Sequence, residues 1–364
     1  MKWISVVGAR PNFIKIAPFC RAVDKYNKTN AAQIEHILVH TGQHYDDKMS
    51  KAFFTELEIP MADLNLDIGS GSHAEQVGKT MIAFEEICIK EQPDLVVVVG
   101  DVNATAACSI TAKKLGIDVA HIEAGLRSGD RGMPEEINRL VTDSISDVLL
   151  APDNFAFDTL LREGHSPDSV HLSGNIMIDT LDRELPKVKN NELPTGLEPN
   201  NYVVVTLHRP ANVDELEKLE KIVNSIITEA DNGTQFYWPV HPRTKTKLEE
   251  FGLLQILEGN DNIILEQPIG YHAILRLNLD AKAFLTDSGG LQEECCVVGT
   301  PCVTLRDNTE RPVTLQEHGG TNVLSSIDSL PEDLAKALSA QRKPFRPEKW
   351  DGHTAERMVA VLAR

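Results

Sequence analysis

Short apolar runs alternate with amphipathic segments along the first half of the chain. The run at 96–99 is an unbroken row of valines. An apolar run of this kind, with no polar alternation, is typical of a parallel strand that helices cover on both faces. Between such runs, segments such as 73–90 and 104–115 carry apolar residues at helical spacing. The pattern predicts strands at 3–7, 34–39, 94–99, 118–122, 147–150 and 170–173.

The alternation stops and then restarts in the second half. Residues 185–201 are rich in Pro, Asn, Gly and charged side chains, which is typical of a connection between domains. After a linker at 342–352, the last segment, 353–364, has the pattern of an amphipathic helix. For the part in between, the pattern predicts a helix at 215–228 and strands at 202–207, 235–240, 262–265, 281–286, 300–305 and 322–324.

Strands that alternate with helices in both halves indicate an α/β protein with two doubly wound parallel sheets. A chain of 364 residues is too long for one ordinary core and suits two domains. We expect the first domain at 1–185, completed by the helix at 352–364, and the second at 186–345. Ligands of such sheets bind at the carboxyl ends of the strands, so the residues there are the candidates for chemistry.

Composition narrows the range of partners. The net charge of −18 argues against nucleic acid, whose phosphate backbone attracts basic proteins. No apolar run approaches the roughly 20 residues that a membrane helix needs, and the first apolar run is too short for a signal peptide. The cysteines show no paired zinc spacing, so we expect reduced, buried thiols in a cytoplasmic protein. They lie at positions 20, 88, 108, 295, 296 and 302.

A glycine turn joins a strand to a helix at 281–294. Ser288, Gly289 and Gly290 lie where this helix begins. Free backbone N–H groups at a helix start attract anions, and glycine lets a phosphate come close to the backbone. The alternative is an ordinary connection in which Ser288 caps the helix.

Glu294 lies on the apolar stripe of the same helix. It shares that face with Leu291 and Val298, where an apolar side chain is expected. A carboxylate one turn behind a bound phosphate would suit a ribose diol.

The first strand is followed by two cations. Arg10 would project from the loop, Pro11 fits the first helical turn, and Lys15 lies little more than one turn further on. Such a pair beside a helix start favours a phosphate clamp. A solvated basic helix start is the alternative, although the helix dipole prefers acids there.

Carboxylates follow the next strands. Asp101 comes directly after the valine strand and is either a helix cap or a catalytic group. Glu123 ends the strand at 118–122, where the rim of the sheet gives it a pocket, which favours a functional role. Glu135, after Pro134, is also what any helix start would show, and it has the i,i+4 spacing of an ion pair with Arg139.

In the second half, two strands end in a histidine with an arginine close by. His208 precedes Arg209, and His241 lies two residues before Arg243. Histidines at neighbouring strand ends indicate a shared site, although a lone histidine there is often only a hydrogen-bonding group. Arg311, before Pro312 at a further helix start, would add a cation near Ser288.

Three common motifs are missing from the sequence. It has no Asp-x-Asp pair of the kind that holds a metal on a diphosphate, and no G-x-x-x-x-G-K-[ST] loop. The glycine-rich run at 69–72 lacks the dinucleotide spacing.

Taken together, these residues resemble the non-hydrolysing UDP-N-acetylglucosamine 2-epimerases nearly from end to end. The segments that carry the resemblance are GARPNFIKIAP (8–18), HTGQHYDDKMS (40–50), GDVNAT (100–105), HIEAGLRSGDRGMPEEINR (121–139), TLHRPANVD (206–214), PVHPR (239–243), LTDSGGLQEE (285–294) and TERP (309–312).

The resemblance implies a fold of two Rossmann-like domains facing a cleft, as in the GT-B glycosyltransferases, with the C-terminal helix crossing back to the first domain. It implies a UDP-sugar substrate, no metal or other cofactor, and a cytoplasmic homodimer. Diphosphate binding falls to Arg10, Lys15, Ser288, Gly289, Gly290 and Arg311, and ribose binding to Glu294. Around the sugar it places Asp101, Glu123, Glu135 and His208 as catalytic residues, with Arg139, Arg209 and His241 among the substrate-binding ones.

Three positions depart from the family pattern. Ile274 stands where many members have an aromatic residue near the uracil. Some members carry a second, regulatory substrate site; Gln43 and His44 of that site are present here, whereas Asp46 and Gly69 differ.

The implied activity inverts C2 of UDP-N-acetylglucosamine to give UDP-N-acetylmannosamine, through elimination of UDP and its re-addition. The alternatives are a hydrolysing epimerase that releases N-acetylmannosamine and UDP, an epimerase of a related 2-acetamido UDP-sugar, and a nucleotide-sugar-binding regulator without catalysis.

Overall fold

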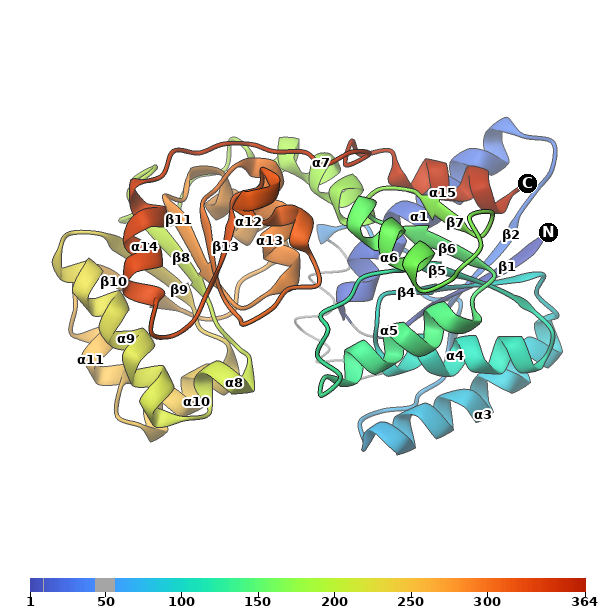
Figure 1. The fold of residues 1–364 in the computed structure, drawn as a ribbon, viewed down its shortest axis with the longest axis horizontal. Helices are drawn as coiled ribbons and strands as arrows, with labels where there is room; N and C mark the ends of the chain where they lie inside the picture. Colours follow the sequence, from blue (N-terminus) through green and yellow to red (C-terminus); the bar gives the residue numbers. More distant parts are fainter. Residues whose placement is uncertain (9, 43–55) are drawn as a thin grey trace. The chain divides into compact units, whose positions relative to one another are not determined.

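The computed structural model describes residues 1–8, 10–42 and 56–364, with residues 10 and 11 described by their backbone only. Its strands form two separate parallel sheets (Figure 1). The chain divides accordingly into two units, Met1–Arg183 with Pro347–Arg364, and Glu184–Arg346.

The first unit is built on a sheet with strand order β3-β2-β1-β4-β5-β6-β7, all parallel. The order reverses between β1 and β4, which is the switch point where doubly wound sheets bind ligands. The strands are β1 (Lys2–Val7), β2 (Glu35–His40), β3 (Leu64–Asn65), β4 (Leu95–Val99), β5 (Asp118–Ile122), β6 (Val148–Ala151) and β7 (Val170–Leu172). The helices are α1 (Arg10–Thr29), α3 (His73–Glu91), α4 (Asn103–Lys114), α5 (Pro134–Ile145), α6 (Asn154–Arg162), α7 (Ile176–Val188), which runs on into the second unit, and α15 (Thr354–Leu362).

The second unit has the strand order β10-β9-β8-β11-β12-β13, again all parallel, with its switch point between β8 and β11. Its strands are β8 (Tyr202–Thr206), β9 (Gln235–Pro239), β10 (Ile263–Glu266), β11 (Ala283–Thr286), β12 (Cys302–Leu305) and β13 (Asn322–Ser325). Its helices are α8 (Pro210–Val213), α9 (Leu216–Asp231), α10 (Pro242–Glu250), α11 (Leu254–Glu258), α12 (Tyr271–Asp280), α13 (Gly289–Val298) and α14 (Leu330–Ser339), with the 3-10 helices η1 (Pro312–Thr314) and η2 (Gln316–His318).

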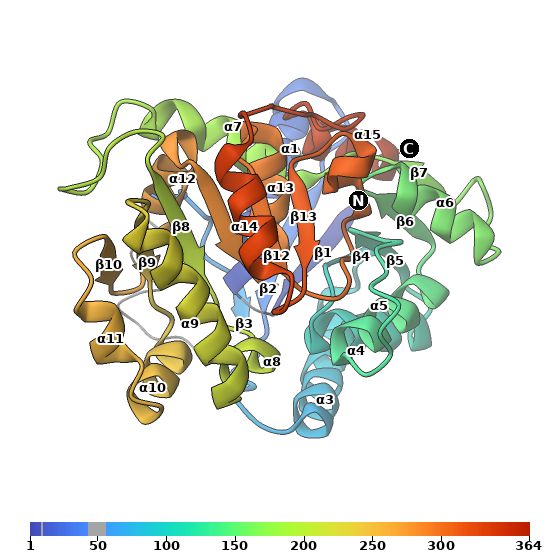
Figure 2. The same ribbon diagram turned by 60° about the vertical axis from the view of Figure 1, so that its left-hand side comes forward.

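Strand β8 shows why its sequence lacks polar alternation. Val203 and Val205 point into a core that α9 and α14 close, and Figures 1 and 2 show these two helices side by side. Tyr202 and Val204 enter the core on the opposite face, with side chains from α12 and α13. Successive residues of a strand face opposite sides, so a sheet covered on both faces requires an unbroken apolar run. The prediction of two doubly wound α/β domains is confirmed.

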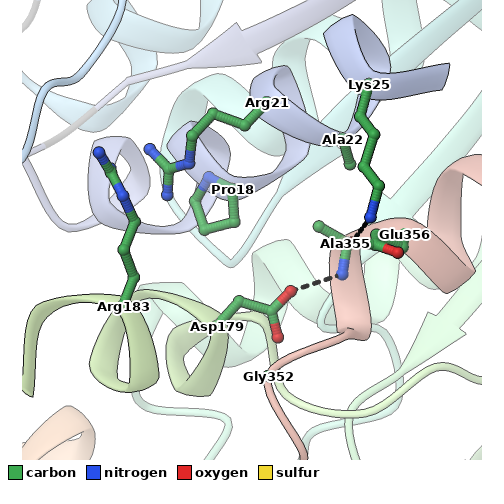
Figure 3. A pocket seen from close by; sticks show the side chains of 9 residues that line it. All are labelled: Pro18, Arg21, Ala22, Lys25, Asp179, Arg183, Gly352, Ala355 and Glu356. Carbon is green, nitrogen blue, oxygen red and sulfur yellow. Dashed lines mark hydrogen bonds and ion pairs between the residues drawn. The ribbon is translucent and has the colours of Figure 1, made fainter. Parts of the chain in front are cut away.

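The C-terminal helix packs on the first unit. The Asp179 carboxylate on α7 accepts hydrogen bonds from the backbone N–H groups of Thr354 (3.0 Å) and Ala355 (2.7 Å), which begin α15. Lys25 on α1 pairs with Glu356 on α15 at 2.6 Å, and Figure 3 shows these groups around a pocket of about 220 Å³. Asp179 thus satisfies the free N–H groups of the helix start and fixes α15 to α7.

The predicted strands are all present, with ends shifted by one or two residues. Strand β3 was not predicted, because its two residues are too short for any periodicity. The helix expected near Arg311 is the 3-10 turn η1. All six cysteines are free and buried, as predicted.

Two of the predictions from the sequence involve the limits of the described residues. Gln43, His44 and Asp46, which bear on a regulatory site, lie outside the described residues. Within the described ranges, no helix is long and apolar enough to cross a membrane.

Candidate functional site

In the first unit, a lysine and a glutamate pair near the switch point. Lys15 Nζ lies 2.5 Å from Glu123 Oε2, and the two side chains are only 11% and 4% exposed. No described residue hydrogen-bonds the buried Oε1 of Glu123. Glu123 also has a φ of +72°, a backbone conformation that non-glycine residues rarely adopt and that clusters at functional sites. The loop after β5 therefore holds one carboxylate oxygen on a cation and leaves the other for chemistry.

Gly100, which follows β4, gives this pair room. A Cβ atom there would lie 3.2 Å from Asn12 Nδ2 and 3.5 Å from Lys15 Nζ, and the φ of Gly100 is +67°. Glycine is the residue that meets both demands.

Asp101, the next residue, is held by a buried arginine. Arg139 Nη1 donates to Asp101 Oδ2 at 2.5 Å; the arginine is 2% exposed and the aspartate 32%. Asn138 Nδ2 also donates to the backbone carbonyl of Asp101. Arg139 thus positions a catalytic candidate, whereas the resemblance placed it among the substrate-binding residues.

The predicted ion pair between Glu135 and Arg139 is wrong: Arg139 pairs with Glu136, at 2.6 Å. The Glu136 carboxylate is buried, and it also accepts the backbone N–H groups of Ser128 (3.0 Å) and Gly129 (2.9 Å). Burial alone would raise the pKa of Glu136, but these donors and Arg139 bring it below its usual value. Glu135 lies exposed in the first turn of α5.

Sequence reasoning missed Glu136. Its spacing of three residues before Arg139 suits an ion pair, but so does the spacing of four from Glu135, so the sequence alone does not choose between them.

A buried pair fixes the loops that carry these groups. His121 Nδ1 lies 2.6 Å from Asp143 Oδ1, and its Nε2 lies 2.8 Å from the Gly100 carbonyl oxygen. The other oxygen of Asp143 accepts the backbone N–H of Gly125 at 3.0 Å. Burial would raise the pKa of Asp143, but His121 and the other donors lower it. This network ties α5 to the loops after β4 and β5.

In the second unit, α13 begins at the switch point, directly after β11. Ser288 is the N-cap residue by position, but its side chain makes no capping hydrogen bond. The interpretation of Ser288 as a side-chain cap is therefore wrong. Ser288, Gly289 and Gly290 are all partly exposed, so the N–H groups of this first turn are accessible to an anion.

Arg311 lies against the same helix start. A Cβ atom on Gly289 would be 2.9 Å from Arg311 Nη1, which places the guanidinium beside the turn. Arg311 Nε contacts Glu293 and Nη1 contacts Glu310, each at 2.7 Å. Burial would raise the pKa of Glu310, but Arg311 and Arg306 hold it well below its usual value. The guanidinium is thus held between the ionised Glu310 and the contact with Glu293 before any ligand binds.

Glu294 is buried behind this turn, with an exposed fraction of 3%. Burial, together with the neighbouring Glu293, raises its pKa to about 7, although a hydrogen bond with the Tyr271 side chain works in the opposite direction. Near neutral pH this carboxyl is therefore available in its protonated form, and can both donate to and accept from a diol.

His208 and Asp287 meet across the second switch point, because one follows β8 and the other β11. His208 Nδ1 lies 2.7 Å from Asp287 Oδ1. The rings of His208 and His241 are 5.7 Å apart, so the two histidines do share a site as expected. Arg209 Nε donates to the Asp287 backbone carbonyl at 2.9 Å. Asp287 was not predicted as a site residue, although its position at a switch point was a usable signal.

The described structure brings the predicted residues into two groups. Lys15, Asp101, Glu123 and Arg139 gather in the first unit, and His208, Arg209 and His241 lie with the Ser288 turn and Arg311 in the second. The side chain of Arg10, the first residue of α1, lies outside the described part. No cluster of three or more potential metal ligands occurs among the described residues.

Comparison with known proteins gives the chain its place. Residues 27–363 match the family described as UDP-N-acetylglucosamine 2-epimerase. The chain is 42% identical to the UDP-N-acetylglucosamine 2-epimerase of Methanocaldococcus jannaschii, over 100% of this chain and 99% of the relative. It is 38% identical, over the full length of both, to the UDP-2,3-diacetamido-2,3-dideoxy-D-glucuronate 2-epimerase of Pseudomonas aeruginosa.

A crystal structure of the M. jannaschii enzyme, in complex with UDP-GlcNAc and UDP, superposes with a TM-score of 0.88 and 41% identity. The match covers 100% of this chain and 99% of that one. By sequence and by structure, the chain belongs to the UDP-N-acetylglucosamine 2-epimerase family.

Proposed function

We propose that the protein interconverts UDP-N-acetylglucosamine and UDP-N-acetylmannosamine without releasing the sugar. The observation that carries this proposal is the buried Lys15–Glu123 pair with Asp101 next to it. An epimerase needs a group that moves the C2 proton and a group that stabilises the negative charge of the leaving UDP. Glu123 can do the first, and Lys15 beside it can do the second. The M. jannaschii relative, whose structure holds UDP-GlcNAc and UDP, supports the choice of substrate.

The second unit would bind the nucleotide. The α13 start with Ser288, Gly289 and Gly290 supplies backbone N–H donors for the diphosphate, and Arg311 supplies a held cation beside them. Glu294 would hydrogen-bond the ribose diol.

The reaction at C2 would proceed by elimination. A base removes the C2 proton, the C–H electron pair forms the C1–C2 double bond, and the C1–O bond breaks with its electrons leaving on UDP. A proton then adds to C2 from the opposite face, and a diphosphate oxygen re-forms the bond to C1. The overall change is inversion at C2, with no net oxidation.

Asp101, Glu123 and Glu135 would supply the base and the acid. In the unliganded chain Lys15 neutralises Glu123, which keeps a buried carboxylate tolerable. A bound diphosphate would compete for Lys15, so substrate binding would free Glu123 as a proton acceptor. Any of the three carboxyl groups could act as the base on one face of C2, with another as the acid on the opposite face.

The P. aeruginosa relative favours a second candidate substrate, a UDP-diacetamido uronate. That sugar would need a cation for its extra carboxylate. A hydrolysing reaction is the further alternative within the same fold. We also propose, from the family resemblance, a cytoplasmic homodimer that serves polysaccharide biosynthesis; light scattering on the purified protein tests the dimer.

Product analysis tests the proposed function. Purified protein is incubated with UDP-N-acetylglucosamine and, separately, with the UDP-diacetamido uronate, and each mixture is separated by ion-exchange chromatography. The proposal expects UDP-N-acetylmannosamine to accumulate to an equilibrium fraction, with no free sugar. Equal release of UDP and N-acetylmannosamine would establish the hydrolysing alternative, and conversion of the diacetamido uronate alone would establish the other substrate.

A further inference from the structure

The Asp287 carboxylate is a fully buried acceptor for four N–H groups of the described chain. His208 Nδ1 lies at 2.7 Å, the backbone N–H groups of His208 and Arg209 at 3.0 Å and 2.8 Å, and Asn212 Nδ2 at 3.2 Å. Burial would raise the pKa of Asp287, but His208 and these backbone donors lower it. Asp287 therefore stays ionised and can only accept hydrogen bonds.

That constraint decides which ring nitrogen of His208 carries hydrogen. Because Nδ1 faces an ionised carboxylate, Nδ1 must donate in both the neutral and the protonated ring. A second proton can therefore bind only at Nε2. This atom hydrogen-bonds no described residue, and the His208 side chain is 45% exposed. Nε2 of His208 is thus the ring nitrogen without a partner among the described residues.

The neighbouring His241 has the opposite arrangement. Its Nδ1 accepts the backbone N–H of Arg243 at 3.2 Å, so its neutral ring carries hydrogen at Nε2. Burial and the nearby His208 lower the pKa of His241, which favours that neutral form. Two rings 5.7 Å apart therefore present a basic nitrogen and an N–H donor, respectively.

We propose that Asp287 is a positioning residue that keeps a hydrogen on Nδ1 of His208. Nε2 of the neutral ring is then a hydrogen-bond acceptor, available to a donor group of the bound sugar. The neutral ring would accept a hydrogen bond from a hydroxyl or acetamido N–H group, whereas phosphoryl oxygens have no hydrogen to offer. The role in turnover rests on the proposed function, but the tautomer of His208 does not.

Asp287→Asn is the informative variant. The oxygen that faces the Arg209 N–H has to remain an acceptor, so the new NH₂ group takes the position opposite His208 Nδ1. The ring must then accept at Nδ1 and carry its neutral-state hydrogen at Nε2. Asn212→Ala is the matched control, since it removes a different donor from Asp287 and leaves the bond to His208 in place.

The test is ¹⁵N NMR of the histidine rings, with His208→Gln used to assign the His208 signals, followed by kinetics with UDP-N-acetylglucosamine. We expect an Nδ1–H tautomer for His208 in the wild type and in Asn212→Ala, and an Nε2–H tautomer in Asp287→Asn. The tautomer of His241 should stay Nε2–H throughout. In Asp287→Asn, kcat should fall by roughly 10²-fold or more with KM changed by less than about threefold.

An Nε2–H tautomer for neutral His208 in the wild type would overturn the proposal, and this arm needs no variant that folds. Unchanged kcat in a folded Asp287→Asn would overturn it too. A wild-type protein that shows the expected tautomer but no epimerisation would instead remove the proposed function.

Discussion

The neighbouring donors and charges decide which buried carboxyl groups of this protein stay ionised. Asp143, Asp287 and Glu310 are buried among N–H donors and keep pKa values below the usual range. Burial raises the pKa of Glu294 to about 7, although a hydrogen bond with the Tyr271 side chain works in the opposite direction. Desolvation acts on all four, so the difference lies in the neighbouring groups: Asp143, Asp287 and Glu310 each have a histidine or arginine beside them, whereas Glu293 lies beside Glu294.

The raised pKa of Glu294 predicts a pH-dependent stability. The folded chain holds a proton that the unfolded chain releases above pH 4.5, so the free energy of unfolding falls as pH rises from about 4.5 through about 7. Glu294→Gln lacks this loss. Relative to the wild type, it should gain about 3 kcal/mol of stability between pH 4.5 and pH 8.

Urea unfolding at both pH values checks this prediction. Glu317→Gln, at a side chain that is 71% exposed, is the control and should behave like the wild type. Parallel pH dependences for the wild type and Glu294→Gln would show that Glu294 is already ionised below pH 7.

At the scale of elements, the first turn of α5 gives two adjacent glutamates different surroundings: Glu136 is buried against Arg139, and Glu135 is exposed. Glu136→Gln removes the charge that holds Arg139 and should destabilise the fold by about 3 kcal/mol, the usual cost of breaking a buried pair. Glu135→Gln alters an exposed side chain, so its stability should stay within about 0.5 kcal/mol of the wild type.

Turnover distinguishes the two glutamates further. If Glu135 acts on the sugar, Glu135→Gln should lower kcat by roughly 10²-fold while the melting temperature is unchanged. Unchanged kcat would take Glu135 out of the catalytic group, and a fully stable Glu136→Gln would contradict the assigned ion pair.

The start of α13 offers a similar pair of neighbours. Gly289→Ala places a methyl group 2.9 Å from Arg311 Nη1 and 3.2 Å from Glu310 Oε1, so the arginine must shift. On Gly290 the same methyl group would meet no heavy atom of the described residues within 4 Å. Both variants should weaken UDP binding by about tenfold, because each disturbs a charged hydrogen-bond site, but only Gly289→Ala should lower the melting temperature.

Calorimetric titration with UDP and thermal unfolding measure the two effects. UDP affinity equal to that of the wild type in both variants would place the nucleotide elsewhere.

At the scale of the whole molecule, the fold was predictable because the strands of a parallel sheet covered on both faces require unbroken apolar runs in the sequence. The valine runs at 96–99 and 203–205 are typical of a strand covered on both faces, and both runs are buried in the structure. Once the strands are known, their carboxyl ends locate Asp101, Glu123 and His208.

Side-chain pairing could not be predicted in the same way. Lys15 and Glu123 are 108 residues apart, and Arg139 and Asp101 are 38 apart, so no local pattern links them. Nor does the sequence say which of Glu135 and Glu136 faces inward, because acids anywhere in a first turn suit the helix dipole.

The central claim is that the protein removes and returns the proton on C2 of a UDP-sugar. Incubation of UDP-N-acetylglucosamine with the enzyme in D₂O, followed by ¹H NMR of the C2 position, tests it most directly. We expect deuterium at C2 in both the N-acetylglucosamine and N-acetylmannosamine forms, with incorporation strongly slowed in Asp101→Asn and Glu123→Gln. Epimerisation without deuterium at C2, or no exchange in the wild type, would contradict it.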